Sequence, residues 1–209
     1  MTGDGTGLLR RRLPRRERER LIVDEAIRFF AEVGFEGQTR ALAQRLGVTQ
    51  PLLYRYFPDK GALIERVYRE AFLDRWDPGW EAMLADRSQP LQDRIATFYR
   101  GYNRMNFSYE RVRLFLFAGL KDQEIGRRYL AFVHQHVFVP IARELLAQAG
   151  RPDADPTPEA IELAAGLHGA VTYLGTRRWV FCAPVPDDDD GAVLRLIQTF
   201  IAGAGAALG

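Results

Sequence analysis

The chain has 209 residues, of which 47% are hydrophobic and 27% are charged, and its formal net charge is +2. This composition is typical of a soluble globular protein with one large or two small domains, long enough to bury a real core. The single cysteine, Cys182, excludes an internal disulfide and favours a reducing compartment.

Neither a membrane span nor a secretion signal is expected. Charge interrupts every apolar run, and the basic N-terminus is followed by acidic residues without a small-residue cleavage site. We therefore expect a cytoplasmic protein. Residues 1–60 contain 12 Lys or Arg and 8 Asp or Glu, a balance of +4 that leaves −2 for the other 149 residues. This asymmetry favours a polyanionic partner for the N-terminal part, although a solvated charged surface explains it equally well.

The first expected elements are short helices separated by clear breaks. Apolar residues recur at helical spacing over about 16–33, and Gly34 ends that helix. A second helix is expected near Thr39–Leu46, followed by Gly47, which suits a left-handed turn. A third helix should begin at the N-cap Thr49.

The third helix tolerates Pro51 in its first turn and should run to about Phe57. Pro58 breaks it, and Asp59 caps a fourth helix near Lys60–Trp76. Further helices are expected near residues 79–86, 90–108, 110–120, 122–149, 157–181 and 189–207. No segment alternates as a strand does, so the sequence predicts an all-α fold.

The third helix carries two different faces. Leu53 and Phe57 share one face and can pack inward, whereas Leu52, Arg55 and Tyr56 lie on another. In a major groove, arginine can bind guanine edges, leucine can cover a thymine methyl group, and glutamine can pair with adenine. Two short helices joined by a tight glycine turn match helix-turn-helix geometry. A simple packed helical hairpin is the alternative.

The segment TRALAQRLGVTQPLLYRYFPDKGAL resembles the DNA-binding head of the tetracycline-repressor (TetR) family. The resemblance covers about residues 18–67, and the rest of the chain resembles the family only in length and helical content. It is carried by Thr39-Arg40, Leu42-Ala43, Gly47-Val48, Gln50-Pro51, Leu53-Tyr54, Phe57, Lys60 and Ala62-Leu63.

The resemblance implies a role in DNA binding for nine residues. Those implied to hold phosphates are Thr39, Tyr54 and Lys60. Those implied to contact bases are Arg40, Gln50, Pro51 and Leu52, with Arg55 and Tyr56 contacting bases or the flanking backbone. Many members carry histidine where this chain has Tyr56, and the loop before Thr39 is short, which leaves the cap of the second helix open.

The chain is expected to have three parts. The first is a basic arm (1–16), whose Gly-rich and Arg-rich composition predicts disorder. The resemblance implies the other two, a three-helix DNA-binding head (17–63) and a helical effector-binding and dimerisation domain (64–209). The arm could follow phosphates or enter the minor groove, or merely aid solubility; its arginines are Arg10, Arg11, Arg12, Arg15 and Arg16. Pairing is expected through the last two long helices, whose small and apolar residues could instead be internal core.

The middle of the chain is rich in aromatic residues, most of which should be core. A small, mainly apolar effector could bind among them. The candidate lining residues are Phe98, Tyr102, Asn103, Phe117, His136, Tyr173 and Trp179.

No catalytic residue, cofactor or metal site is expected. His134 and His136 point in different directions on a helix, and Cys182 has no local histidine partner. The favoured interpretation is a ligand-responsive homodimeric transcriptional repressor with a near-palindromic DNA operator. The alternatives are an effector-independent DNA-binding regulator, or an all-helical enzyme or carrier, which would lack an acid/base constellation.

Overall fold

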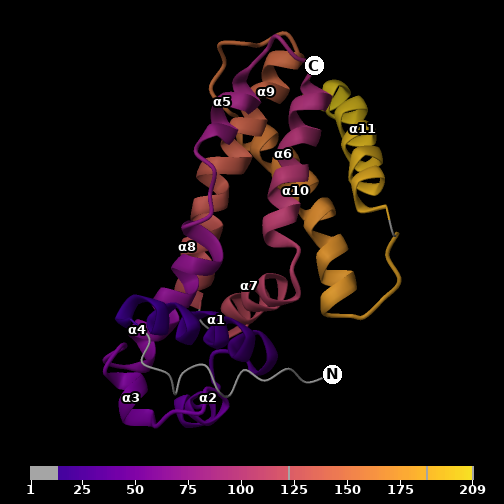
Figure 1. Ribbon diagram of the computed structural model, residues 1–209. Helices are drawn as coiled ribbons and strands as arrows, with labels where there is room; N and C mark the ends of the chain where they lie inside the picture. The colour runs from indigo at the N-terminus through magenta and orange to yellow at the C-terminus, as the bar shows by residue number, and fades with distance from the viewer. Residues whose placement is uncertain (1–13, 122, 187, 209) are drawn as a thin grey trace. The chain divides into compact units, whose positions relative to one another are not determined.

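The computed structural model describes residues 14–121, 123–186 and 188–208 (Figure 1). Within these ranges all regular structure is helical, which confirms the all-α prediction. The chain forms two compact units. Unit 1 comprises Met1–Trp76 and Arg113–Gly126, and unit 2 comprises Asp77–Val112 and Arg127–Gly209.

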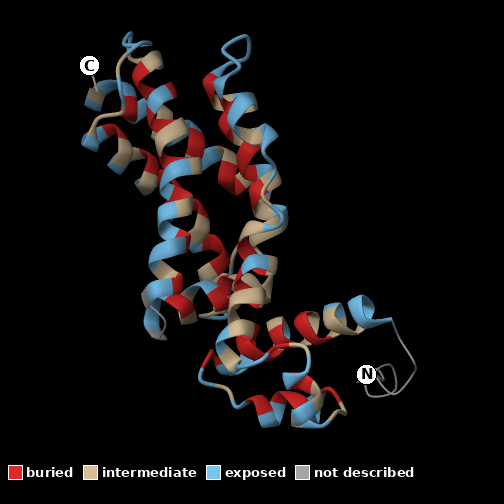
Figure 2. Cartoon of the chain, turned by 90° about the vertical axis from the view of Figure 1, so that its left-hand side faces the viewer, coloured by how far each residue is buried: buried red, intermediate tan, exposed pale blue. Residues whose placement is uncertain are grey.

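Besides residues 113–121 of α7 (Tyr109–Lys121) and residues 123–126 of α8 (Gln123–Val133), unit 1 contains four complete α-helices and one π-helical segment. They are α1 (Arg15–Val33), α2 (Thr39–Arg45), α3 (Gln50–Tyr54), α4 (Lys60–Tyr68) and η2 (Arg69–Leu73). The inward faces of these helices are buried (Figure 2), and the largest fully buried side chains include Ile22, Phe30, Leu42, Leu53 and Leu63. Burying a side chain of this size contributes about 1.5–3 kcal/mol each.

The corner between α2 and α3 has the predicted chemistry. Gly47 adopts φ +67°, a left-handed conformation that is strained for residues with a Cβ atom. The Thr49 hydroxyl accepts a hydrogen bond from the Leu52 amide, and the Asp59 carboxylate accepts one from the Ala62 amide at 2.7 Å. Both predicted N-caps are therefore confirmed.

Helix α3 is shorter than predicted, because its regular part ends at Tyr54. The chain still completes a helical turn, since the amides of Tyr56 and Phe57 donate to the Leu53 carbonyl at 3.0 and 3.1 Å. Pro58 follows, and a residue that precedes proline is disfavoured in the α conformation. Pro58 therefore limits the helical turn to Phe57, the residue at which the sequence predicted the end of the helix.

Two predicted long helices are each interrupted by a π-helical segment. Segment η2 ends the fourth helix, and η3 (His134–Phe138) divides the predicted helix over 122–149 into α8 (Gln123–Val133) and α9 (Val139–Gln148). Pro140 lies just after η3 and has no amide hydrogen to donate back to His136. The wider π turn, in which the Val139 amide donates to the His134 carbonyl, adapts the helix to this proline.

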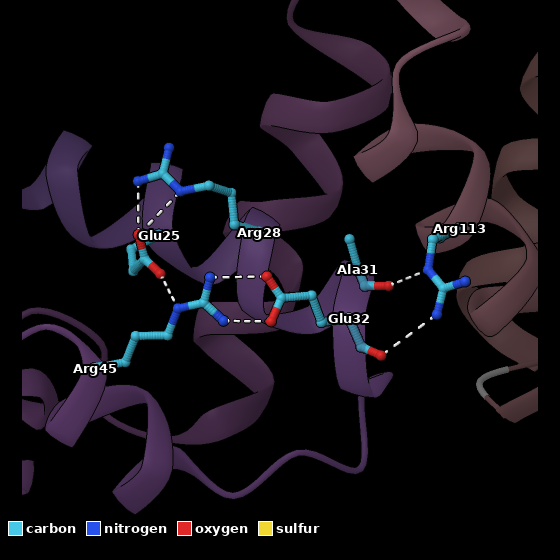
Figure 3. A network of polar contacts seen from close by, with 6 residues as sticks. All are labelled: Glu25, Arg28, Ala31, Glu32, Arg45 and Arg113. Atoms are coloured by element: carbon cyan, nitrogen blue, oxygen red, sulfur yellow. Dashed lines mark hydrogen bonds and ion pairs between the residues drawn. The ribbon is translucent and has the colours of Figure 1, made fainter. Parts of the chain in front are cut away.

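A network of charged groups ties together three elements of unit 1 (Figure 3). The Arg45 guanidinium on α2 makes two hydrogen bonds to the Glu32 carboxylate on α1, at 2.5 and 2.8 Å, and also pairs with Glu25. The Arg45 hydrogen bond lowers the pKa of Glu32 below its ordinary value. Arg113 lies in the part of α7 that belongs to unit 1. Its guanidinium donates to the Ala31 carbonyl at 2.6 Å and so supplies a hydrogen bond to the C-terminal turn of α1.

Unit 2 contains the remaining helices. They are α5 (Gly79–Ala85), α6 (Leu91–Asn106), the start of α7 (Tyr109–Lys121), the remainder of α8, then η3, α9, α10 (Pro158–Trp179) and α11 (Asp189–Leu208). Its interior includes a cluster of aromatic side chains around His168, whose ring lies 5.2 Å from Tyr102 and 5.4 Å from Phe138. The imidazole Nδ1 is 3.3 Å from the Tyr99 hydroxyl, and burial lowers its pKa to about 4.

Helix α11 corrects the expectation that no segment could span a membrane. Among the described helices it is long and apolar enough by length and composition. The run from Gly191 to Leu208 contains a single charged residue, Arg195, which does not break an 18-residue window. Only 28% of that window is buried, and large apolar residues such as Leu196, Phe200 and Ile201 remain half-buried at the surface.

The buried His168 makes the stability of the fold depend on pH. Because its pKa falls from 6.5 to about 4 on folding, the unfolded chain binds more protons between these values. Stability is complete above pH 6.5 and falls by up to about 3 kcal/mol as the pH drops towards 4. Urea unfolding at pH 7 and pH 4.5 should show this loss in the wild type and a smaller loss in His168→Gln. Equal losses in both proteins would contradict the assignment.

Candidate nucleic-acid interface

Helix α3 presents the face that the sequence analysis assigned to DNA. Leu53 and Phe57 are 1% and 5% exposed and anchor the helix in unit 1. On the other side Arg55 is exposed, and Leu52 and Tyr56 are half-buried at the surface. Elsewhere on this surface Arg40 and Pro51 are exposed, and Lys60 is half-buried at the first residue of α4.

Three predicted DNA-binding residues form one hydrogen-bonded cluster. The Thr39 hydroxyl lies 2.9 Å from the Tyr54 hydroxyl and accepts a hydrogen bond from the Gln50 side-chain amide at 2.9 Å. The same amide nitrogen is 3.4 Å from the Tyr54 hydroxyl. The cluster links the first residue of α2 to both ends of α3, so it fixes the position of α3 relative to α2.

The cluster leaves one hydroxyl hydrogen free for an outside acceptor. One hydroxyl of the Thr39–Tyr54 pair must donate to the other, so only the hydrogen of the accepting hydroxyl remains. Thr39 is 6% exposed and Tyr54 is 38% exposed. The hydroxyl that an outside acceptor can reach is therefore that of Tyr54, and Thr39 orients it.

The predicted basic arm lies mostly outside the described residues. Arg10, Arg11 and Arg12 fall in that part of the chain, whereas Arg15 and Arg16 form the exposed first turn of α1. The Arg15 guanidinium carbon lies 5.9 Å from the centroid of the Tyr56 ring, a cation–π distance that brings α1 to α3.

The seven predicted effector residues occupy several different environments. Phe98 and Tyr102 lie together in the buried aromatic cluster of unit 2, with ring centroids 5.6 Å apart, and the Asn103 Oδ1 atom is buried without a hydrogen-bond partner. His136 pairs with Glu81 at 2.5 Å, and the Trp179 indole donates to the Phe107 carbonyl at 2.6 Å.

The two remaining effector candidates lie apart from this cluster. Phe117 belongs to unit 1, where its ring packs against the turn at Gly34 and under the Arg113 guanidinium. Tyr173 is 54% exposed on α10. The structure thus groups Phe98 and Tyr102 but does not gather all seven residues around one centre.

Sequence reasoning missed the partners that complete the aromatic cluster. Trp80 packs edge-on against Phe98 at 5.3 Å, and the Tyr129 hydroxyl is 2.8 Å from that of Tyr102. These partners come from distant parts of the chain, and nothing in their local sequence signals the contacts. Within the described residues, no group of three or more His, Cys, Asp or Glu side chains could hold a metal ion.

Comparison with known proteins identifies the class of protein. The family described as "Bacterial regulatory proteins, tetR family" matches residues 22–67, which span α2, α3 and most of α1 and α4. The "HTH-type transcriptional regulator BetI" of Burkholderia lata is 25% identical over 195 residues, covering 86% of this chain and 90% of that protein. Residues 22–67 thus match the TetR family, and the longer matches along the chain are also to transcriptional regulators.

TetR-family proteins resemble the chain in part or in fold. The tetracycline repressor protein class A from transposon 1721 of Escherichia coli is 33% identical over 89 residues, which is 38% of this chain and 41% of that protein. Solved TetR-family structures from Mesorhizobium loti and Pseudomonas syringae share the fold, with TM-scores of 0.62 and 0.60 and identities of 16% and 18%. They cover 93% and 91% of this chain, and 98% and 97% of their own. The names of these relatives describe transcriptional regulators and a repressor.

The Thr39–Gln50–Tyr54 cluster predicts the effect of removing one hydroxyl group. Tyr54→Phe should weaken DNA binding by about 1 kcal/mol on every sequence, since it removes a neutral donor to a phosphate. The dependence of affinity on salt should not change, because no charge is removed. Fluorescence anisotropy on two unrelated duplexes measures both quantities. Wild-type affinity in the variant would show that the Tyr54 hydroxyl does not touch DNA.

Proposed function

We propose that this protein is a TetR-family regulator, a ligand-responsive homodimeric repressor that binds a near-palindromic operator in double-stranded DNA. The observation that carries the proposal is the two-sided segment 50–57, made up of α3 and the helical turn that follows it. Leu53 and Phe57 of this segment are buried, while Leu52, Arg55 and Tyr56 remain at the surface. A helix anchored in this way by a tight turn can enter a major groove with its outer face towards the base edges.

The proposed DNA contacts divide into positioning and sequence-specific ones. Tyr54 and Lys60 hold phosphates, and the dipole at the N-terminus of α4 reinforces the charge of Lys60. Arg40, Gln50, Pro51 and Leu52 contact bases, with Arg40 placed for the acceptors of guanine. Arg55 and Tyr56 contact bases or the adjacent backbone. Binding chromosomal DNA places the protein in the cytoplasm.

Dimerisation is proposed through α10 and α11. Four positions of α10 at helical spacing are exposed: Gly166, Gly169, Ala170 and Tyr173. A Cβ atom added at Gly166 or Gly169 would meet no atom within 4 Å beyond its own stretch of helix. Beside them, a cavity of about 480 Å³ is lined mainly by apolar residues of both helices, and only 28% of the apolar part of α11 is buried. A second copy of the same two helices would bury these surfaces in a four-helix bundle.

The effector is proposed to bind among the aromatic residues of unit 2, where the buried Asn103 Oδ1 atom has no hydrogen-bond donor. The ligand would favour a conformer in which the two recognition helices no longer match the spacing of the DNA groove. The affinity for DNA then falls by the factor by which the ligand prefers this conformer to the DNA-binding one. The close packing of Phe98 and Tyr102 favours the alternative, an effector-independent regulator. Thermal shift against a metabolite panel separates the two, because only the gated protein gains stability with a ligand that also releases DNA.

A pair of variants tests the division between base and phosphate contacts. Arg40→Ala should cost about 1–3 kcal/mol on the preferred site and relax discrimination at one base position. Lys60→Ala should weaken binding to all sequences alike and reduce the salt slope by about one. Fluorescence anisotropy measures the affinities and their salt dependence on two duplexes. One is a DNA fragment that adjoins the gene for this protein, and the other is a scrambled duplex. The base assignment fails if Arg40→Ala keeps full selectivity. Equal wild-type affinity for both duplexes contradicts the proposed function.

The small-residue stripe of α10 predicts the response to one large side chain. Gly169→Arg should convert the dimer into folded protomers and abolish tight operator binding, because the guanidinium fills the space that the partner's helix needs. Ala131→Arg, at an exposed position of α8, adds the same charge and should remain dimeric. Sedimentation velocity distinguishes the species. A dimeric Gly169→Arg protein would place the interface elsewhere.

A further inference from the structure

A small basic cavity lies between the start of α1 and helix α3. Its volume is about 320 Å³, far more than one water molecule needs, and its lining residues are Arg15, Arg18, Leu52, Arg55 and Tyr56. Three of these five carry guanidinium groups, and none is acidic. Charges of one sign around a confined space raise the local potential for the opposite charge. The cavity is therefore suited to an anion.

Contact with Tyr56 gives Arg15 a defined place beside the cavity. A long exposed arginine side chain ordinarily samples many rotamers, and holding it in one of them is entropically unfavourable. Here its guanidinium lies 5.9 Å from the Tyr56 ring centroid, and this cation–π contact favours the rotamer that faces α3. The charge is thus partly pre-positioned before any ligand arrives.

The backbone of α1 adds to the positive potential. The helix is 19 residues long and begins after Pro14, which provides no side-chain hydrogen bond to the first turn. The amides of the first turn have no acceptor within the helix, and the helix dipole places partial positive charge there. The acidic residue of this turn, Glu17, does not line the cavity.

We propose that this cavity binds a phosphodiester group of the operator backbone, next to the groove that α3 enters. The inference rests on the proposed function and extends the DNA contact to Arg15 and Arg18 of α1. Guanidinium groups can bind phosphate oxygens in pairs. Leu52 and the Tyr56 ring supply apolar surface for the attached deoxyribose, which a free phosphate ion lacks. DNA therefore fits the cavity better than the free ion.

The test compares the salt dependence of DNA binding in Arg15→Gln and Arg20→Gln. Arg20 is a matched control, since it lies on the same helix, has a 76% exposed side chain and pairs with Asp24 outside the cavity. Between about 50 and 200 mM salt, Arg15→Gln should lose the slope of one phosphate contact, so its affinity falls about 3.5-fold less than that of the wild type. Arg20→Gln should keep the wild-type slope. Arg18→Gln should behave as Arg15→Gln, and Arg15→Lys should restore most of the slope.

Tyr56 provides an independent check. Tyr56→Phe retains the ring under Arg15 and should keep the salt slope, whereas Tyr56→Leu should lower it towards that of Arg15→Gln. Thermal unfolding of each variant shows whether the fold is intact. Identical slopes for wild type, Arg15→Gln and Arg20→Gln would overturn the proposal.

A phosphate buffer distinguishes the two sources of the anion. Replacing chloride by inorganic phosphate at equal ionic strength should displace DNA equally from the wild type and from Arg15→Gln. Binding of inorganic phosphate to the wild type but not to Arg15→Gln, with identical DNA salt slopes in the two proteins, would assign the cavity to the free ion and overturn the DNA assignment. The slopes are also measured on a scrambled duplex, because a backbone contact does not depend on sequence. If the wild type binds both duplexes equally well, the proposed operator-specific function fails. The difference in salt slope between wild type and Arg15→Gln still tests the phosphodiester contact in the cavity.

Discussion

Burial of Leu53 and Phe57 is the interaction on which the proposed DNA-binding surface depends. Helix α3 has five residues, and an isolated helix of that length is not stable in water. Its conformation is therefore imposed by the two buried side chains, and by the left-handed turn at Gly47 that brings the chain round from α2. Because the anchored face is fixed, the opposite face can only point to solvent. The side chains proposed to bind DNA occupy that face.

Polar contacts set the orientation of this surface more than its stability. Exposed ion pairs such as Arg45–Glu32 are worth about 0–1 kcal/mol each, less than the burial of one large apolar side chain. Their value lies in geometry, since the two hydrogen bonds from Arg45 fix α2 against α1 (Figure 3). The Thr39–Gln50–Tyr54 cluster then fixes α3 against α2. The hydrophobic interior stabilises the helices, and the hydrogen bonds at its edge fix their orientation. The proposed DNA-binding surface is therefore pre-organised.

The helix-turn-helix was predictable because its caps and its turn depend on residues close together in sequence. Features that depend on contacts between residues far apart in sequence were not predictable. Caps at Thr49 and Asp59 and the glycine turn act over a few residues, and the structure shows them as predicted. The π-helical segment η3 was missed, because a proline in a long apolar pattern does not reveal how the helix adapts to it.

The candidate site divides in the same way. The exposed face of α3 followed from helical spacing, whereas the cation–π contact between Arg15 and Tyr56 joins residues 41 positions apart and left no local signal.

The most direct test of the central claim is selection of bound duplexes from a random pool by the purified protein. The account predicts a near-palindromic site whose two half-sites are centred about one helical turn apart, or a multiple of it. Recovery of sequences with no shared motif, or of a lone half-site without its symmetric partner, would contradict it.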